Sequence, residues 1–419
     1  MVFFTQRKIP GLHKGSTKLR ASCKQREYMG FQVTVVLGAS GRIGRLLRHC
    51  WSGEESRTRI RWQSRRPLPA LKTPREALQE ACLADPSQHT VLDILAEPQR
   101  LAELCRGADV VLCLAGSLPG RGGDLSDNSR LAIAAVQAAA RAAQAPDAQA
   151  ADGQAANGQA AGAPFSGTGF LGKRSSPARV VLASSAAVYG NQPGLLREEG
   201  PPQHPPMNTS LQATMPSTMP TTGPTTVPTC APVSPYGLAK REMEHQALAL
   251  GHQLGVPVTA LRIGNIAGLD AILGGWRPGF CLDQFADGRS PRRSYIGPLT
   301  LARLLAALVA QKHLPPLLNL AQPGPLEMAA LLRAARYPFC WQPAPEGAIA
   351  EVSLDLSRLR GILPDRDLQR LISEPADARQ MLAEWRQIEP VFSKNVTGQM
   401  PAADLSDPLH MSEHKERDS

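Results

Sequence analysis

The feature that most constrains the fold is a repeated alternation of short β-rich runs with helical stretches, which begins at Phe31. Runs such as Val110–Leu114 lack polar alternation, which is typical of strands buried on both faces. Six strands are expected at Val33–Leu37, Arg59–Gln63, Thr90–Ile94, Val110–Leu114, Val180–Ser184 and Thr259–Ile263, and a seventh at Leu317–Ala321. Strands separated by helices build a parallel sheet covered on both faces. The sequence therefore predicts an α/β protein with a doubly wound parallel sheet.

Three segments after Phe31 do not follow this rhythm. Residues 144–176 form an Ala/Gln/Gly/Asp tract, and residues 203–232 are rich in Pro, Thr and Met. Neither has the periodicity of a packed element, so both are expected to be mobile surface insertions. A lid is the alternative for 203–232, because it lies between catalytic segments. Residues 393–419 are polar and are expected to be a disordered tail.

The basic amino-terminal segment accounts for most of the net charge of the chain. The formal net charge is +10, but residues 1–29 hold seven basic residues against one acid and so account for +6 of it. The remainder is only mildly basic, so no nucleic-acid surface is expected, and binding through the basic tail is a minor hypothesis. The segment itself could be a disordered tail, an organelle-targeting leader, or a start assigned upstream of a natural Met29.

The cysteines and the hydropathy point to a cytoplasmic protein. The eight cysteines form no Cys-x-x-Cys pair and have no partnering His spacing, which argues against a metal site and against a disulfide framework. They lie at Cys23, Cys50, Cys82, Cys105, Cys113, Cys230, Cys281 and Cys340. No run approaches the roughly 18 apolar residues of a membrane helix, so no membrane partner is expected.

A glycine-rich turn follows the first strand and precedes a helix expected at Arg45–Trp51. Glycines let the backbone approach a pyrophosphate, and the free N–H groups at the helix start stabilise its charge. This context predicts dinucleotide binding on a Rossmann domain. The residues expected to contact the cofactor here are Gly38, Ser40, Gly41, Arg42, Ile43 and Gly44.

The end of the second strand bears on the choice of dinucleotide. NAD sites commonly place a carboxylate there for the adenosine ribose, but this chain has Ser64, Arg65 and Arg66. Two guanidiniums would favour a 2′-phosphate, so NADP is the expected cofactor and NAD the alternative. Arg65 and Arg66 could instead be a solvated strand end.

Two further motifs complete a catalytic pattern. Residues 184–190 read Ser-Ser-Ala-Ala-Val-Tyr-Gly at the end of the fifth strand, and Tyr236 and Lys240 lie four residues apart in a helical run that starts with a proline. This spacing projects both side chains from one helix face. An adjacent ammonium is expected to lower the pKa of the phenol toward neutrality. Taken singly, the motifs could be a serine-capped turn and an amphipathic helix.

With the Gly-x-x-Gly-x-x-Gly spacing and this order along the chain, the sequence resembles the extended short-chain dehydrogenase/reductase family of the sugar-nucleotide epimerase/dehydratase type, over about residues 31–360. The resemblance implies Ser185, Tyr236 and Lys240 as catalytic residues, with Tyr236 and Lys240 also touching the cofactor. It further implies cofactor contacts from Asp93, Ile94, Leu114, Ala115 and Gly116. For Asp93 a turn cap is the alternative. Asn128 resembles a family asparagine and could equally be a helix cap.

The resemblance weakens on the substrate side. Residues 261–268 resemble the family motif L-R-x-x-N-x-x-G, which makes Asn265 a substrate contact, and Arg293 resembles an arginine that binds a substrate phosphate. Gly297, Pro298 and Thr300 replace the His, Val and Asp that follow it in the family. The resemblance implies a small-molecule substrate of the nucleotide-sugar type, and this divergence makes that specificity uncertain.

The residues after the catalytic serine narrow the reaction. Family dehydratases have Asp and Glu there, whereas this chain has Ala186 and Ala187, which cannot move a proton. The expected activity is therefore hydride transfer in an epimerase or, alternatively, in an NADPH-dependent carbonyl reductase, and a non-catalytic dinucleotide sensor or assembly protein stays open. Residues 30–263 are expected to form the Rossmann domain and residues 264–392 a smaller, mostly helical substrate region. Many family members are homodimers, which makes a homodimer an open expectation here.

Overall fold

The structure of the protein is a computed structural model that describes residues 32–51, 58–68, 89–120, 123–144, 176–192, 194–199, 234–363 and 365–392. Both predicted tails and the predicted insertion at 203–232 lie outside the described residues. So does the insertion at 144–176, apart from its two end residues.

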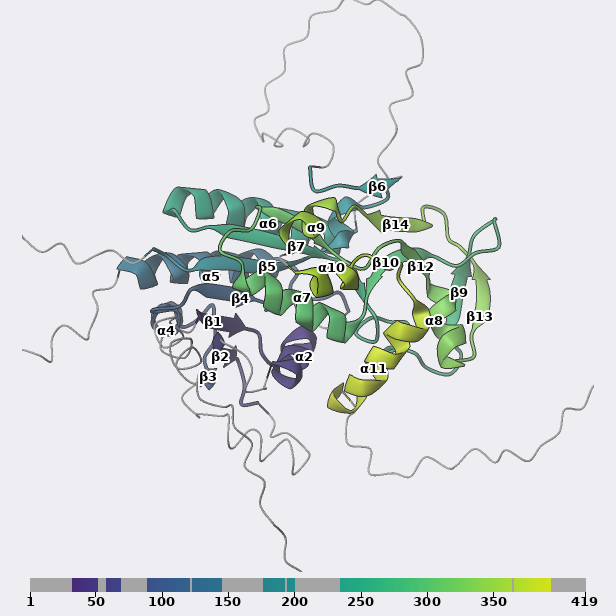
Figure 1. The fold of residues 1–419 in the computed structure, drawn as a ribbon, viewed down its shortest axis with the longest axis horizontal. Coiled ribbons are helices and arrows are strands. Elements are labelled where there is room, and N and C mark those ends of the chain that lie inside the picture. Colours follow the sequence, from purple (N-terminus) through teal and green to yellow (C-terminus); the bar gives the residue numbers. More distant parts are fainter. Residues whose placement is uncertain are drawn as a thin grey trace, which may run out of the picture.

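The main sheet contains the seven strands that the sequence predicts. They are β1 (Gln32–Leu37), β2 (Thr58–Ser64), β3 (His89–Val91), β4 (Val110–Cys113), β5 (Arg179–Ser185), β7 (Val258–Ile263) and β11 (Leu317–Leu320). Their order is β11-β7-β5-β4-β1-β2-β3, and every neighbouring pair is parallel. The chain therefore has the predicted α/β, Rossmann-like fold (Figure 1). The strand order reverses between β1 and β4, which is where such sheets bind dinucleotides.

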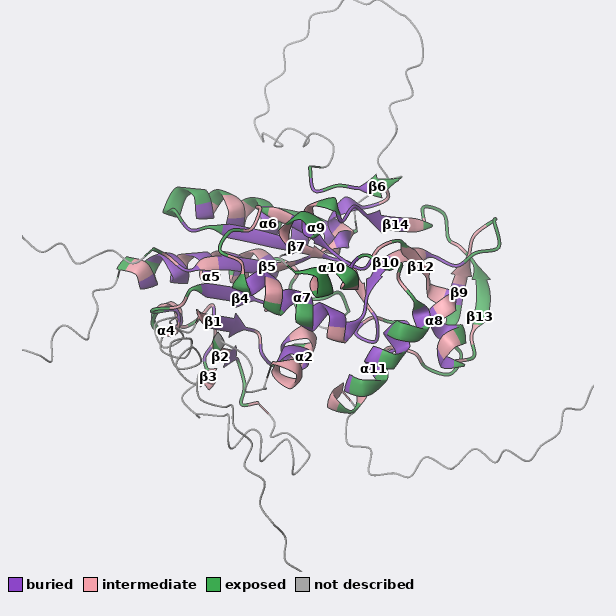
Figure 2. Ribbon diagram, viewed as in Figure 1, coloured by how far each residue is buried: buried purple, intermediate pink, exposed green. Residues whose placement is uncertain are grey.

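Helices cover both faces of this sheet, and the strand residues alternate between them. Val35, Leu37 and Leu182 pack in one core with α4, α5 and α6, whereas Val36 and Leu112 pack in the other with α2 and α7. All of these strand residues are fully buried, or nearly so (Figure 2). The helices are α2 (Arg42–Cys50), α4 (Pro98–Leu104), α5 (Asp127–Gln144), α6 (Pro235–Leu254) and α7 (Pro298–Ala310). Burial on both faces explains why the strands read as continuous apolar runs.

The region after Gly264 differs from the expectation, because it is not mostly helical. One sheet has the order β12-β10-β14-β6, with β8 paired to β10, and a second consists of β13 and β9. These strands have two to five residues each, which is too short for a clear alternation in the sequence. They are β6 (Leu195–Leu196), β8 (Asn265–Ile266), β9 (Cys281–Gln284), β10 (Arg292–Ile296), β12 (Pro325–Glu327), β13 (Cys340–Pro343) and β14 (Glu351–Leu354).

The carboxyl-terminal helix joins this region to the main sheet. Four more helices complete the described fold, and they are α8 (Met328–Ala335), α9 (Ser357–Ile362), α10 (Arg366–Leu371) and α11 (Ala378–Phe392). α11 packs against α2, α7 and α8. The Trp385 side chain lies over Gly268, where any Cβ would overlap the indole ring at 2.1 Å. The two regions therefore share one continuous hydrophobic core.

The cysteine spacing argued against a disulfide framework, but the structure pairs two of the cysteines. Cys281 and Cys340 are disulfide-bonded. The parallel pairing of β9 with β13 places these residues directly opposite each other, although they are 59 positions apart in the sequence. Sequence spacing alone gives no sign of such a pairing. The cysteine argument for a reducing compartment therefore loses its support.

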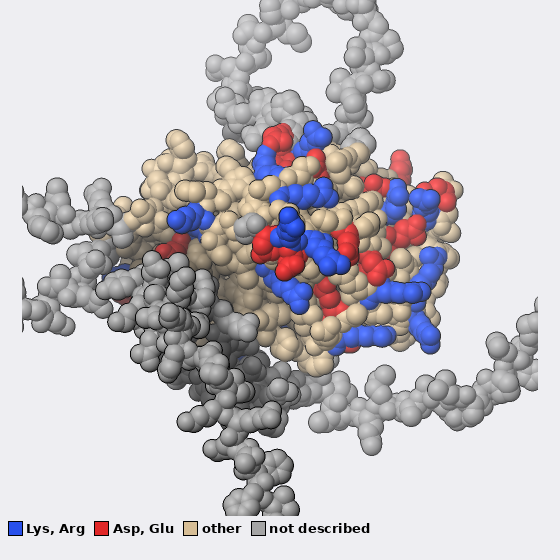
Figure 3. Space-filling view, in the orientation of Figure 1, with Lys and Arg blue, Asp and Glu red and all other residues tan. Residues whose placement is uncertain are grey.

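Surface charge, helix hydropathy and side-chain clusters in the described residues concern nucleic-acid, membrane and metal binding, respectively. Figure 3 shows basic and acidic side chains interspersed on the face in view, without a continuous basic stripe there. Among the described residues, no helix has the length and apolar content needed to cross a bilayer. Within that same part of the chain, no cluster of His, Cys, Asp and Glu side chains has the arrangement of a metal site.

Candidate active site

The glycine turn lies where the strand order reverses. Gly38 follows β1 with a φ of +87°, a conformation that favours glycine. Its backbone N–H donates to Gln63 Oε1 at 3.0 Å. A Cβ on Gly38 would stand 2.7 Å from the backbone N of Ala115, which follows β4. The structure thus brings together two of the predicted cofactor segments, the turn after β1 and the small residues after β4.

The turn leads directly into α2. Gly41 is the residue before the helix, no side chain caps the first turn, and that turn contains no acid. A Cβ on Gly44 would lie 2.4 Å from the carbonyl oxygen of Gly38, so a glycine is needed there for the helix to pack on the turn. Uncapped N–H groups at a helix start form an anion site. These residues therefore fit a dinucleotide pyrophosphate. The Arg42 side chain donates to the carbonyl of Leu269.

The predicted adenosine side of the site lies at the ends of β2 and β3. Arg65 and Arg66 are exposed, while Ile94 is buried. Asp93 Oδ1 accepts hydrogen bonds from the backbone N–H groups of Leu95 and Ala96. The Asp93 carboxylate therefore caps the turn that follows β3, which was the alternative role for this residue. β3 ends at Val91, three residues before the predicted end of the strand at Ile94. Its contact with adenine stays a prediction.

The three predicted catalytic residues come together at the carboxyl end of β5. Ser185 ends this strand, and its hydroxyl is close enough to the Tyr236 phenol to lower the pKa of that group. Tyr236 and Lys240 lie in the first two turns of α6, with Lys240 Nζ 5.9 Å from the centroid of the Tyr236 ring. Ser234 caps that helix, because its hydroxyl accepts a hydrogen bond from the backbone N–H of Gly237 at 3.1 Å. A positioned phenol is one of the side chains that can act as a general acid or base toward a hydroxyl or carbonyl.

Lys240 lies beside the small residues that follow β4. Its Nζ donates to the carbonyl of Ala183 at 2.8 Å, and a Cβ on Gly116 would be 3.4 Å from it. Asn128 also adjoins Gly116, and its side chain bonds to both the N–H and the carbonyl of Ser117. Asn128 thus orders the loop after β4. The ammonium, the loop and the glycine turn share one edge of the sheet.

The pKa of the phenol differs from the expectation. Burial raises the pKa of Tyr236, and the hydrogen bond with Ser185 lowers it in part. Lys240 is not among the groups that shift this pKa, and its Nζ donates to the carbonyl of Ala183. Its own burial lowers the pKa of Lys240 to about 8. In this geometry Ser185, and not Lys240, is the group that favours the phenolate.

The predicted substrate residues are engaged with the protein. Arg293 donates to the carbonyl oxygens of Arg292, Ile349 and Ala350 at 2.7 to 3.2 Å. The Asn265 side chain hydrogen-bonds Tyr295, whose hydroxyl donates to Asp270 Oδ2 at 2.7 Å. Both residues therefore help to build the second sheet in this structure, and their contact with a substrate stays a prediction.

A surface cavity of about 590 Å³ lies between the ends of β9 and β13. Its lining includes Gln284, Phe285, Trp341 and Pro345, and none of the predicted site residues. It is therefore not evidence for the site described above.

Comparison with protein families gives one match, over residues 34–272, to the model described as the NAD dependent epimerase/dehydratase family. The match covers more than half of the chain and contains the glycine turn and all three catalytic candidates. The chain belongs to the NAD dependent epimerase/dehydratase family. No curated protein matches the sequence.

Solved structures similar to this family member include three nucleotide-sugar proteins. MoeE5 with UDP-glucuronic acid and NAD is 18% identical, with a TM-score of 0.53, covering 85% of this chain and 99% of MoeE5. UDP-glucuronic acid 4-epimerase from Bacillus cereus with UDP-glucuronic acid and NAD is 15% identical, with a TM-score of 0.54 and coverages of 86% and 100%. DesIV, a dTDP-glucose 4,6-dehydratase from Streptomyces venezuelae with NAD, is 16% identical, with a TM-score of 0.53 and the same coverages. At these identities the likeness concerns the fold.

Sequence reasoning did not single out the role of two buried polar residues, Gln63 and Glu244, and of the partly buried Arg262 in this family member. Gln63 bridges the glycine turn and β3, because its Nε2 also donates to the carbonyl of Leu92 at 2.8 Å. Glu244 and Arg262 form an ion pair of 2.8 Å next to Ser184. The spacing of Tyr236, Lys240 and Glu244, each four residues after the last, was an available signal that all three share a helix face.

Proposed function

We propose that this protein is an NAD(P)-dependent oxidoreductase or epimerase acting on a hydroxyl or carbonyl carbon of a nucleotide sugar or a related small molecule. The observation that carries the proposal is the convergence of Ser185, at the end of β5, with Tyr236 and Lys240, one turn apart on α6, at the sheet edge that also holds the glycine turn. Membership of the family supports the same class of chemistry. The ligands named with similar structures support a nucleotide sugar as the substrate.

Each part of the site has a role in holding the cofactor. The turn at Gly38 and Gly41 and the start of α2 would bind the pyrophosphate, and the small residues after β4 would leave room for the dinucleotide. Lys240 would bind the nicotinamide ribose. When bound, the nicotinamide supplies the hydride acceptor or donor of the reaction.

The side chains of this protein would move the proton. Tyr236 would take a proton from a substrate hydroxyl or return one to a carbonyl oxygen, and Ser185 would orient that oxygen by a hydrogen bond. The Ser185 hydroxyl favours the phenolate form, and burial of the phenol opposes it. Ala186 and Ala187 offer no group for the proton transfers of water elimination, which favours epimerisation or net reduction over dehydration.

The direct test is hydride exchange by the full chain. The purified protein is incubated with each dinucleotide and with UDP-glucose, UDP-glucuronic acid and dTDP-glucose, and nicotinamide absorbance and sugar NMR are followed. Exchange with at least one sugar is expected, with a loss of about 100-fold or more in Tyr236→Phe. Tyr337→Phe is the matched control, because Tyr337 stacks on Trp276 away from the site. Equal rates in both variants would refute the role of Tyr236.

We further propose NADP as the preferred cofactor. Arg65 and Arg66 are exposed at the end of β2, where a 2′-phosphate would be bound, and Ser64 supplies no carboxylate to repel it. Similar structures hold NAD, so both dinucleotides are titrated by fluorescence. Arg65→Ala/Arg66→Ala should weaken NADPH binding about tenfold or more and leave NADH binding nearly unchanged. Tighter binding of NADH by the unaltered protein would overturn the preference, and Arg59→Ala, which changes an exposed arginine near the start of β2, is the control.

One observation favours a second candidate, a dinucleotide-binding protein without turnover. The Arg293 guanidinium, expected to bind a substrate phosphate, is occupied by three backbone carbonyls. Such a protein would bind dinucleotide equally well as Tyr236→Phe and show no hydride exchange with any sugar.

A further inference from the structure

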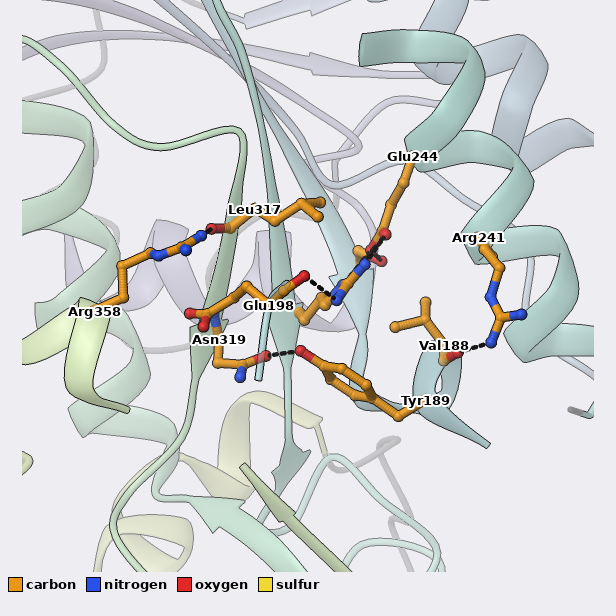
Figure 4. Close-up of polar contacts among 10 residues, drawn as sticks. Val188, Tyr189, Glu198, Arg241, Glu244, Leu317, Asn319 and Arg358 are labelled. Atoms are coloured by element: carbon orange, nitrogen blue, oxygen red, sulfur yellow. Dashed lines mark hydrogen bonds and ion pairs between the residues drawn. The ribbon is translucent and has the colours of Figure 1, made fainter. Parts of the chain in front are cut away.

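Polar contacts from three residues of α6 hold this helix against the end of β5 and the turn that follows it. Lys240 donates to the carbonyl of Ala183, and Glu244 accepts a hydrogen bond of 2.5 Å from the Ser184 hydroxyl. Arg241 donates to the carbonyl of Val188 in the turn η3 (Ala186–Tyr189), as Figure 4 shows. The residues contacted lie on both sides of Ser185. The helix that carries Tyr236 is therefore tied to the segment that carries its hydrogen-bonding partner.

Glu244 is the charged member of these contacts and is itself enclosed. It is 3% exposed and pairs through both carboxylate oxygens with Arg262 of β7, at 2.8 to 3.2 Å. Arg262 in turn lies 4.8 Å above the Tyr189 ring, and the Tyr189 hydroxyl donates to Asn319 Oδ1 at 2.7 Å (Figure 4). A carboxylate buried at this depth loses its hydration. The stability of its charged form therefore depends on the hydrogen bonds and the ion pair with these partners.

The groups that face Lys240 come from several elements. On α6 they are Tyr236 and Glu244, and on β4 there is the Cys113 thiol. Burial raises the pKa of Cys113 to about 11, so this thiol is uncharged at neutral pH. Ala183 of β5 contributes a carbonyl oxygen, and Asn128 of α5 adjoins the same glycine as Lys240 with a neutral amide. The Glu244 carboxylate is therefore the negative charge that opposes the desolvation of the ammonium near neutral pH.

We propose that Glu244 is a positioning residue of this site: its buried carboxylate holds α6 to the end of β5 and keeps the Lys240 side chain protonated beside Tyr236. Arg262 acts through Glu244. Its guanidinium holds the carboxylate in place and partly neutralises the negative charge that acts on Lys240. Neither side chain needs to touch a substrate. The catalytic meaning of the inference rests on the proposed function, but the electrostatic claim does not.

The test measures the protonation of Lys240 in the full chain, without substrate. Lysine is labelled with ¹³C at Cε, the NMR signals are titrated with pH, and the Lys240 signal is assigned by its loss in Lys240→Arg. Burial lowers the pKa of Lys240 to about 8, so the titration is within reach. Glu244→Gln keeps the size of the side chain and one acceptor oxygen and removes its charge. We expect the acid dissociation constant of the ammonium to rise about tenfold.

Two further variants decide the interpretation. Glu384→Gln changes another buried glutamate, which contacts Thr300 at the start of α7, and should leave the Lys240 titration unchanged. If Glu244→Gln does not fold, Glu244→Gln/Arg262→Gln replaces the ion pair with two amides and should shift the titration in the same direction. An unchanged titration in the folded Glu244 variant, or an equal shift in Glu384→Gln, overturns the inference. A shift at Lys240 in a protein that shows no hydride exchange would support the inference and count against the proposed function.

Discussion

Gly38→Ala separates the two demands that the structure places on the glycine turn. The first demand is a φ of +87°, and the second is the approach of Ala115, whose backbone N would lie 2.7 Å from the new Cβ. A positive φ costs a non-glycine residue about 1–2 kcal/mol. The overlap involves backbone on both sides and cannot be relieved by a side-chain rotation, so a further 1–3 kcal/mol or so is expected.

Gly324→Ala is the matched control for this prediction. Gly324 has a φ of +75°, but no atom lies within 4 Å of its Cβ position. Urea unfolding of both variants should therefore show a free energy of unfolding lower by about 1–2 kcal/mol for Gly324→Ala, and by about 2–5 kcal/mol for Gly38→Ala. Gly38→Ala should also weaken dinucleotide binding, measured by fluorescence titration, because it moves the turn. Equal stabilities of the two variants would refute the close approach of β1 and β4.

Three other predictions concern two buried side chains and the disulfide. Burial lowers the pKa of Lys240 from 10.5 to about 8, so between pH 8 and 10.5 the unfolded chain binds more protons than the folded one. The free energy of unfolding should therefore rise with pH across this window. The rise should be about 3 kcal/mol larger in the unaltered protein than in Lys240→Met. Glu384 accepts hydrogen bonds from the Thr300 N–H and hydroxyl at the start of α7, so Glu384→Ala should lower the free energy of unfolding by about 1–2 kcal/mol, with Glu389→Ala as a control on the same helix. Cys281→Ser/Cys340→Ser should lower it by about 2–4 kcal/mol in urea, and added reductant should destabilise only the unaltered protein.

The main sheet was predictable because local sequence determines it. A strand buried on both faces needs an uninterrupted apolar run, and Val110–Leu114 and Val180–Ser184 satisfy that need without reference to the rest of the chain. The short strands after Gly264 were not predictable in the same way. A strand such as β8, with two residues, is defined by its pairing with Tyr295 and Ile296 and not by its own composition.

The same distinction applies to the candidate site: local spacing predicts some of its features, and only the packed structure determines the others. Helical spacing alone brings Tyr236 and Lys240 to one face, and the proline before them sets the start of the helix. The direction of the Lys240 ammonium was not predictable, and neither was the effect of burial on the Tyr236 pKa. They depend on Ala183 and Ser185, which reach the site from β5.

The amino-acid sequence by itself determined the α/β class, the strand order along the chain and the residue types available for chemistry, because periodicity and turn residues act over a few positions. Tertiary structure alone decided which groups meet. The bond between Cys281 and Cys340, the ion pair of Glu244 with Arg262, and the use of Arg293 inside the protein all join segments distant in sequence. The physical reason is that burial and proximity set charge, pKa and bonding, and both arise only when the sheet and helices have packed together.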